Sequence, residues 1–438
     1  MTDTALITAL LTIIAAAAIP NILAMSVAVT TPLRVAIIGG GVSGCASARR
    51  LAQLAPAAQI TLYEIGRGPG GRASTRKTRS LPGVYINHGT PLCDLRTDLG
   101  RSLISSLDTG AATFTGVRGC LEYSTGKFLR HKEEEDVMHI TGANGEMSQI
   151  SSSLLSDLPS VQTKYKTMIR GLAKTADGVW ELRDKSDTLI GSADWLVVAG
   201  SGVAHPRWTN SFGGVPPLVE AESNNPDPQL RKALDEIAKQ QTSPIMAVFF
   251  SFTGQVAREW LSLDFNVANV EGSSILSKII IHGNKGDDDD DDDGNEVDDW
   301  CSVVLHSTEK FANQNVGTYG ASSSAARIAG AASDSSLEDE LIETMMNALT
   351  EIPGTPTIDK SKMDGKSYGP MLHRWGNAFP KGEALAQELA FLPSSRVSFC
   401  GDYVASPEKA RFGSFEAALL SGTFAGESIA NYMANCHN

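Results

Sequence analysis

The glycine-rich turn after the first strand-like run constrains this chain more than any other stretch. Residues 35–38 are apolar and typical of a buried strand. Three glycines follow at the G-x-G-x-x-G spacing: Gly39, Gly41 and Gly44. A helical pattern of small residues and arginines comes next, and a second apolar run, residues 59–63, ends at Glu64. This order of strand, glycine turn, helix and strand predicts a dinucleotide-binding unit of an α/β fold.

Each glycine of the turn has a mechanical reason to be there. Gly39 allows a tight turn from strand to helix, Gly41 lets a pyrophosphate approach the backbone, and Gly44 lets helix and strand pack closely. The start of the helix, at Val42 and Ser43, offers unpaired N–H groups and a partial positive charge to the phosphates. We therefore predict that all five residues belong to a cofactor site.

Two features after the second strand extend this site. Glu64 stands twenty residues after the last glycine, where a carboxylate can accept hydrogen bonds from ribose hydroxyls. Its charge would repel a 2′-phosphate, so the site suits FAD or NAD better than NADP. The following loop contains Gly70, Gly71 and Arg72, two flexible residues before a guanidinium that can bind a diphosphate. The alternative is a solvated basic loop.

Composition bounds the remaining possibilities. The chain has 438 residues, enough for two domains, and a formal net charge of −13, of which seven charges lie in the aspartate run 287–293. No basic stripe with interleaved aromatic residues appears, so we expect no nucleic-acid partner. The six cysteines are scattered without a C-x-x-C pair, and we predict no metal site.

The N-terminal residues 1–31 form a separate apolar segment. Residues 5–19 are a run of fifteen apolar or small residues, which is short for a membrane span and close to the length of a signal-peptide core. The first residues carry Asp3 and no Lys or Arg, which argues against a signal peptide. We expect a cleaved secretory or organelle-targeting segment and no stable membrane span; the alternative is a cytoplasmic protein translated from Met25.

Four later stretches, together with the fingerprint and the Gly-Gly-Arg loop, resemble the FAD-dependent amine oxidases, and among them the renalase group. They are ITGANGEMSQISSSLL (140–155), WCSVVLHSTEKFAN (300–313), HRWGNAFP (373–380) and FCGDYVASPEKARFGSFEAALLSGTFAGESI (399–429). The resemblance spans roughly residues 33–430 but consists of separate motifs. It implies non-covalent FAD, because the cysteine that monoamine oxidases use to tether flavin is missing from the expected position.

The resemblance also implies further cofactor contacts. The backbone at Ile169 is the best match to the adenine contact, although an ordinary core residue fits equally well. In the family, the aspartate of the Gly401–Asp402 pair bonds the ribityl chain and phosphate. The helix start at Gly413, Ser414 and Phe415 would direct its N–H groups at the flavin edge that gains negative charge on reduction. Gly200 closes another buried strand, which predicts a further approach to the cofactor.

Candidate catalytic residues are His88, His306 and His373. His88 is either an acid or base or a hydrogen-bonded structural histidine. Trp375 is either a packing residue or a platform for the substrate. The resemblance implies hydride transfer from a small-molecule substrate to flavin, with oxygen as acceptor, as in renalase-type oxidation of misreduced nicotinamide dinucleotides. Alternatives are oxidation of an amine, desaturation of a polyene, or an FAD-binding protein without turnover. No protein partner is evident.

The predicted fold class is α/β. A Rossmann-like FAD-binding domain would be assembled from residues 32–95, 140–210 and 395–438. Residues 96–139 and 211–394 would form an α+β substrate domain with a mainly antiparallel sheet, containing strands at 245–252 and 300–305. We expect the acidic stretch 284–298 to be a disordered insertion in this domain.

Overall fold

The structure is a computed structural model that describes residues 32–436, except 108, 133, 285–298, 322, 324–334, 359–366 and 409. The predicted targeting segment and nearly all of the acidic insertion lie outside the described residues. Within the described part, no helix is long and apolar enough to cross a bilayer.

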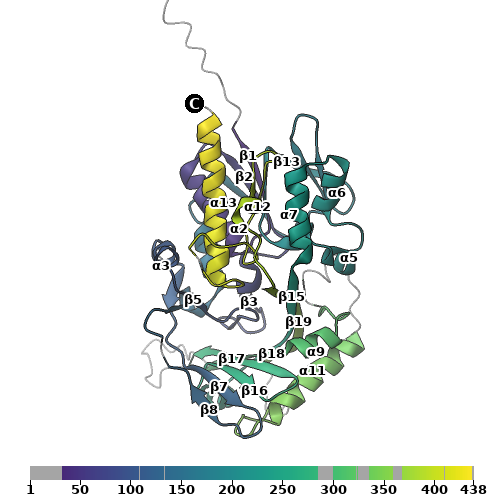
Figure 1. The fold of residues 1–438 in the computed structure, drawn as a ribbon. Helices are drawn as coiled ribbons and strands as arrows, with labels where there is room; N and C mark the ends of the chain where they lie inside the picture. Colours follow the sequence, from purple (N-terminus) through teal and green to yellow (C-terminus); the bar gives the residue numbers. More distant parts are fainter. Residues whose placement is uncertain are drawn as a thin grey trace, which may run out of the picture. The chain divides into compact units, whose positions relative to one another are not determined.

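The first of the two large sheets has six strands and is mainly parallel (Figure 1). Its order is β10 (Val161–Lys164), β2 (Gln59–Tyr63), β1 (Arg34–Ile38), β14 (Trp195–Val198), β21 (Val397–Phe399) and β20 (Phe391–Leu392). All neighbours are parallel except β20 with β21. The strands are apolar on both faces because helices or loops cover both, as expected of a parallel sheet.

One face of this sheet is covered by α2 (Val42–Leu54), α4 (Ser148–Leu155) and α13 (Phe415–Cys436), whose apolar side chains share one cluster. α13 lies against α2 because two of its residues are glycines. A Cβ at Gly422 would lie 2.1 Å from the carbonyl oxygen of Ser43, and one at Gly426 would lie 2.5 Å from that of Ser47. The fingerprint helix and the C-terminal helix therefore pack backbone to backbone.

The same cluster includes part of the first predicted substrate segment. The three-stranded sheet of β5 (Cys93–Leu95), β9 (Met138–Gly142) and β6 (Ala111–Thr113) adjoins α3 (Asp98–Ser105). Leu95, Ile104 and Ile140 from these elements pack in the cluster that holds α2 and α13. The predicted boundary at residue 96 therefore differs from the structure, in which α3 and β6 belong with the parallel sheet.

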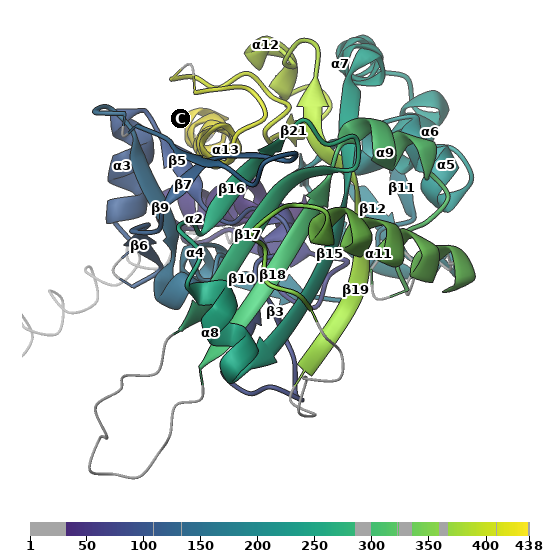
Figure 2. The same cartoon turned by 90° about the horizontal axis from the view of Figure 1, so that it is seen from below.

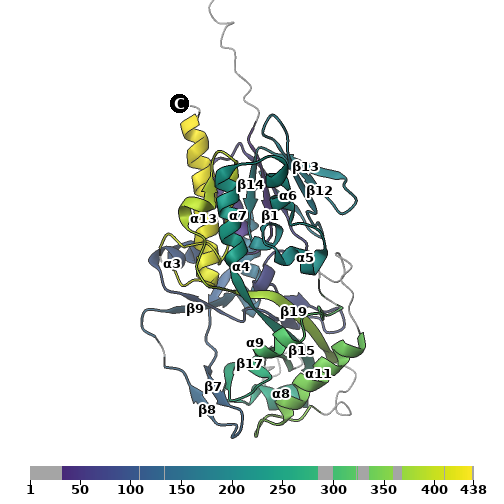
Figure 3. The same ribbon diagram turned by 45° about the vertical axis from the view of Figure 1, so that its right-hand side comes forward.

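The opposite face of the six-stranded sheet is covered by a small antiparallel sheet and by helices from the predicted substrate domain. A meander of β11 (Gly171–Lys174), β12 (Trp180–Arg183) and β13 (Leu189–Ala193) precedes β14. Helices α6 (Pro217–Asn224), α7 (Pro228–Lys239) and α12 (Gln387–Ala390) pack in one apolar cluster with Val198. Figure 3 shows α7 beside β14, with α6 close by. These helices lie inside the range 211–394 assigned to the substrate domain, yet they bury their apolar faces against the parallel sheet.

The second large sheet has seven strands and is mainly antiparallel, as predicted. Its order is β19 (Ser367–Lys381), β15 (Gln241–Thr253), β18 (Trp300–Ser307), β17 (Leu276–Asn284), β16 (Val267–Glu271), β7 (Arg118–Glu122) and β8 (Phe128–Arg130). Only β16 and β7 pair in parallel. The predicted strands at 245–252 and 300–305 are confirmed within β15 and β18. Helices α8 (Gln255–Leu261), α9 (Glu309–Gln314) and α11 (Ser335–Thr350) cover one face (Figure 2).

Candidate functional site

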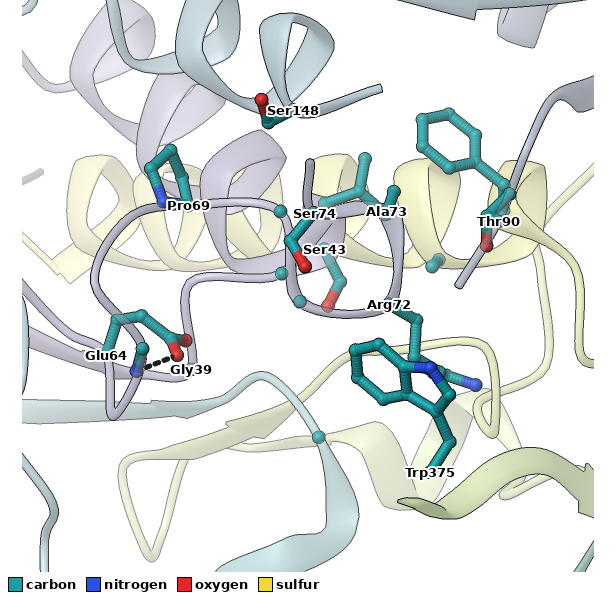
Figure 4. A pocket seen from close by; sticks show the side chains of 18 of the residues that line it. Gly39, Ser43, Glu64, Pro69, Arg72, Ala73, Ser74, Thr90, Ser148 and Trp375 are labelled. Carbon is teal, nitrogen blue, oxygen red and sulfur yellow. Dashed lines mark hydrogen bonds between the residues drawn. The ribbon is translucent and has the colours of Figure 1, made fainter. Parts of the chain in front are cut away.

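A cavity of about 840 Å³ follows the carboxyl ends of the parallel strands. Fourteen of the sixteen residues predicted to bind a cofactor line it: Gly39, Gly41, Val42, Ser43, Glu64, Gly70, Gly71, Arg72, Gly200, Gly401, Asp402, Gly413, Ser414 and Phe415. In the view of Figure 4, Glu64 lies on one side of this cavity, with Arg72 and Trp375 on the other. Ligands in open α/β sheets occupy this end of the strands. We call it the main cavity.

Two of the three fingerprint glycines, Gly39 and Gly44, lie close to neighbouring backbone. Gly39 has φ +111°, and a Cβ on it would lie 2.7 Å from the carbonyl oxygen of Ala199. A Cβ on Gly44 would lie 2.0 Å from the carbonyl oxygen of Gly39, so this glycine allows α2 to pack on its own strand. A Cβ on Gly41 would meet no atom within 4 Å, because this residue faces the open cavity. Gly44 therefore contributes to packing and does not line the cavity.

Glu64 is held by the backbone of two neighbouring turns. Its Oε2 accepts the N–H of Gly40 at 2.6 Å, and its Oε1 accepts the N–H of Gly66 at 2.5 Å. Burial raises the pKa of this carboxyl, and the two backbone hydrogen bonds partly oppose that shift. The carboxylate is thus fixed at the cavity wall, with lone pairs left over for a hydroxyl donor.

Arg72 is paired with a carboxylate. Its two terminal nitrogens donate to both carboxylate oxygens of Asp402, at 2.7 and 2.6 Å, and Nη1 also donates to the carbonyl oxygen of Ala378. The pair joins the loop after β2 to the loop after β21, 330 residues apart in the chain. Arg72 lines the cavity, but its charge is compensated by a carboxylate. In this structure it therefore positions the loop around Asp402.

The start of α13 lies at the cavity wall. The N–H of Gly413 donates to the backbone carbonyl oxygen of Asp402 at 3.0 Å, and the N–H of Ala417 donates to Ser414 Oγ at 3.0 Å. Glu416 in the first turn is buried and accepts from the N–H groups of Arg96 and Thr97. The carboxylate of Glu416 therefore accepts hydrogen bonds from the loop before α3, and it does not line the main cavity, whereas Gly413, Ser414 and Phe415 do.

Ile169 is not brought to this site. It lies between β10 and β11, is buried in the apolar cluster that contains α6 and α7, and does not line the main cavity. The predicted adenine contact at Ile169 thus falls on a non-strand connection away from the main cavity.

The three predicted catalytic histidines are neighbours, although they come from distant segments. The carbonyl oxygen of His88 accepts hydrogen bonds from Trp375 Nε1 at 3.1 Å and from His306 Nε2 at 3.2 Å. The ring centroids of His88 and His373 are 4.9 Å apart, and those of His373 and Trp375 are 4.2 Å apart. His88, His373 and Trp375 line the main cavity.

All three imidazoles are held neutral. Burial lowers the pKa of His306 and of His373 to about 3, and lowers that of His88 well below its usual value, with smaller effects of His373 and Arg76. Nδ1 of His88 and Nδ1 of His373 are buried without a hydrogen-bond partner in the described part of the chain. As the structure stands, these rings form a neutral wall of the cavity.

A second cavity of about 400 Å³ adjoins the main one. The two share eight lining residues: Arg72, Thr90, Trp375, Ala378, Phe379, Gly413, Ser414 and Phe415. Its floor is the seven-stranded sheet, where pairing places Asn269, Lys278 and His306 side by side on β16, β17 and β18. Sequence reasoning missed Lys278. The available signal was a single lysine in the otherwise apolar strand LSKIII.

Neither a cysteine nor a metal-binding cluster lines the main cavity in the described part of the chain. Among the described residues, no cluster of three metal-binding side chains occurs. All six cysteines are free thiols. Cys45 in α2 is fully buried and its pKa is raised, chiefly by burial, so it acts as a small packing residue.

Comparisons with known proteins agree with this architecture. A family described as NAD(P)-binding Rossmann-like domain matches residues 37–98. No curated protein sequence matches the chain at a significant level. Three solved structures superpose over about 91–92% of this chain and 99–100% of their own.

These structures are a candidate protoporphyrinogen oxidase from Exiguobacterium sp. 255-15 (TM-score 0.57, 12% identity), cyclohexylamine oxidase from Brevibacterium oxydans IH-35A (0.55, 12%) and putrescine oxidase bound to putrescine (0.51, 14%). At such identities the similarity concerns the fold. The described chain thus has the fold of these structures, with a Rossmann-like part and a mainly antiparallel sheet.

Proposed function

We propose that this chain binds FAD in the main cavity and is an FAD-dependent oxidoreductase. The observation that carries the proposal is the continuity of that cavity. It is lined by Glu64, the fingerprint glycines, Asp402 and the start of α13. Its volume of about 840 Å³ falls within the range of about 300–1,000 Å³ that cofactor and ligand sites occupy. The open space beside Gly41 is where a pyrophosphate could approach the backbone.

The protein's contribution would be binding and orientation. Glu64 would receive the ribose hydroxyls, the start of α2 would bind the pyrophosphate, and the N-terminus of α13 would stabilise negative charge at its end of the cavity. Bound FAD would supply a two-electron acceptor for a hydride from the substrate, with oxygen as the final acceptor. The neutral rings of His88 and His373 would exclude water from the wall near Trp375.

We further propose renalase-type chemistry, the oxidation of misreduced nicotinamide dinucleotides, as the specific activity. Its support is the motif resemblance: the stretches HRWGNAFP and GDYVASPEKARFGSF supply Trp375, Ala378 and the start of α13, which border both cavities. Amine oxidation is less well supported. Among the described residues no tyrosine lines either cavity, so the chain offers no tyrosine pair to hold an amine between two rings.

An anaerobic absorbance titration tests both the FAD-dependent oxidoreductase activity and the renalase-type specificity. The full-length protein should be yellow as purified, or become so with added FAD. Reduced nicotinamide preparations that contain the misreduced isomers should bleach the flavin bands at once, and air should restore them. Pure 1,4-NADH, cyclohexylamine and putrescine serve as matched comparisons.

The outcomes separate these two parts of the proposal. Bleaching by an amine alone would contradict the renalase-type activity and leave the oxidoreductase standing. A protein that takes up no FAD would contradict the whole assignment.

A further inference from the structure

The second cavity has an unusual charge. Five basic side chains among its described lining residues face three carboxylates: Arg72, Arg96, Arg118, Lys278 and Arg411 against Asp94, Glu134 and Glu416. A cavity that bound an amine would instead present carboxylates or aromatic faces to the cation. The balance of charge therefore points to a ligand of the opposite sign.

Three of the five basic groups are already compensated. They form the pairs Arg72–Asp402 (2.6 Å), Arg96–Glu134 (2.8 Å) and Arg118–Asp94 (3.7 Å). The third carboxylate of the lining, Glu416, is 1% exposed and accepts two backbone N–H groups and the hydroxyl of Thr97. Its hydrogen bonds are thus made to the loop before α3, and no basic side chain pairs with it.

Lys278 and Arg411 are the two that remain. Neither forms an ion pair or side-chain hydrogen bond with any residue the structure describes. Lys278 projects from the middle of β17 between Asn269 and His306 of the neighbouring strands. Burial lowers the pKa of Lys278; Asp94 partly offsets this, while the like charges of Arg411 and Arg118 add to it. Three positive charges, from Lys278 on β17, Arg118 on β7 and Arg411 in a loop, thus surround the second cavity.

Leaving the partly buried ammonium of Lys278 without a partner is unfavourable, because it has lost part of its hydration without gaining a counter-charge. His306 beside Lys278 provides none, since its imidazole is neutral. Arg411 is exposed and keeps its hydration, so it can reach an anion from the solvent side of the cavity. We infer that the second cavity binds the anionic group of the substrate, a carboxylate or a phosphate, through Lys278 and Arg411. This rests on the proposed function and adds that the substrate reaches the flavin where the two cavities meet.

Lys278 and Arg411 lie close to the boundary between the two cavities. Arg411 lies two residues before Gly413, which borders both cavities, and Lys278 lies across the same space on the sheet. An anion bound between them would hold the rest of the substrate against Trp375 and the start of α13. The oxidised carbon and the anionic group would thus belong to one small molecule.

The test uses four small probes of similar shape: benzoate, phenyl phosphate, benzyl alcohol and benzylamine. Isothermal titration calorimetry measures their binding to the FAD-loaded full-length protein, and the flavin spectrum reports whether they bind next to the cofactor. We expect one or both anions to bind about 10- to 100-fold more tightly than benzyl alcohol, because a charge-assisted hydrogen bond is worth about 1.5–3 kcal/mol. Benzylamine should bind most weakly. The order of benzoate and phenyl phosphate distinguishes a carboxylate from a phosphate site.

Variants assign the effect to the two residues. Lys278→Met and Arg411→Met should each lower anion affinity about 10-fold or more, without changing the affinity for benzyl alcohol or FAD. Lys278→Arg should restore most of the anion binding. Lys381→Met is the matched control, because Lys381 is also a strand lysine but is paired with Glu309 at 2.5 Å and lines neither cavity. It should change anion affinity less than about threefold.

The inference fails if the FAD-loaded protein binds the anions no better than benzyl alcohol, or if both methionine variants keep anion affinity within threefold. Should Lys278→Met not fold, Arg411→Met and Lys278→Arg still decide the question. If the protein binds no FAD, calorimetry on the cofactor-free protein reports the anion preference separately. Failure of the proposed function is thereby distinguished from failure of the anion site.

Discussion

Two glycines of the fingerprint, three residues apart, should respond to the same substitution in opposite ways. Gly41→Ala adds a methyl group where no atom lies within 4 Å. Gly44→Ala adds one 2.0 Å from the carbonyl oxygen of Gly39 and 3.1 Å from the Cβ of Ala199. The first change should leave the fold and obstruct the cofactor, whereas the second should destabilise the fold itself.

The magnitudes follow from these contacts. At position 44 the clash is with backbone, so α2 must move away from β1, and overpacking of this kind costs about 1–3 kcal/mol or more. The higher helix propensity of alanine returns about 1 kcal/mol, so we expect a net loss of about 2 kcal/mol in the free energy of unfolding. At position 41, φ is −70° and the residue caps α2, so the loss should stay below about 1 kcal/mol.

For FAD affinity, in contrast, we expect the larger loss in Gly41→Ala. A methyl group in the open space beside α2 would displace the pyrophosphate from one or two backbone N–H groups. Hydrogen bonds to charged groups are worth about 1.5–3 kcal/mol each, so the Kd for FAD should rise roughly 10- to 100-fold or more. Urea unfolding of the cofactor-free protein measures stability, and quenching of flavin fluorescence measures affinity. Equal destabilisation by both variants, or an unchanged Kd in Gly41→Ala, would refute the reasoning.

Three further outcomes are expected. Asp402→Ala removes the partner of Arg72, whose side chain is about one-third exposed, so we expect a loss of about 1–3 kcal/mol rather than the 3–5 of a fully buried pair; an unchanged urea midpoint would contradict this. Glu64→Gln replaces one acceptor by an amide NH₂ that faces a backbone N–H, which should cost about 1–3 kcal/mol and weaken FAD binding in the same titration. The pKa values of His306 and His373 are lowered to about 3, so as the pH falls these histidines become protonated in the unfolded chain before they do so in the folded protein. Their full contribution to the free energy of unfolding should therefore be present above about pH 6.5, and at pH 4.5 it should be smaller by about 2–3 kcal/mol per histidine. Thermal unfolding of the cofactor-free protein at both pH values checks this, and a double His→Asn variant should show a shallower pH dependence.

Local patterns in the sequence predicted the elements that depend on near neighbours. The turn at Gly39, the helix after Gly41 and the strand ending at Glu64 each follow from spacing within about thirty residues, and the structure contains all three. The C-terminal helix and the strands in β15 and β18 were visible for the same reason: hydrophobic periodicity reports how a segment is buried.

Tertiary structure alone decided which distant residues meet. No local pattern indicates that Arg72 pairs with Asp402, because the contact depends on the neighbouring order of β1, β14 and β21. Lys278 lies beside His306 because of strand register, and a shift by one residue would turn either side chain to the opposite face. The packing of α3 and α6 against the parallel sheet was not visible in the sequence for a related reason, since an amphipathic helix shows that it has a buried face but not which sheet covers it.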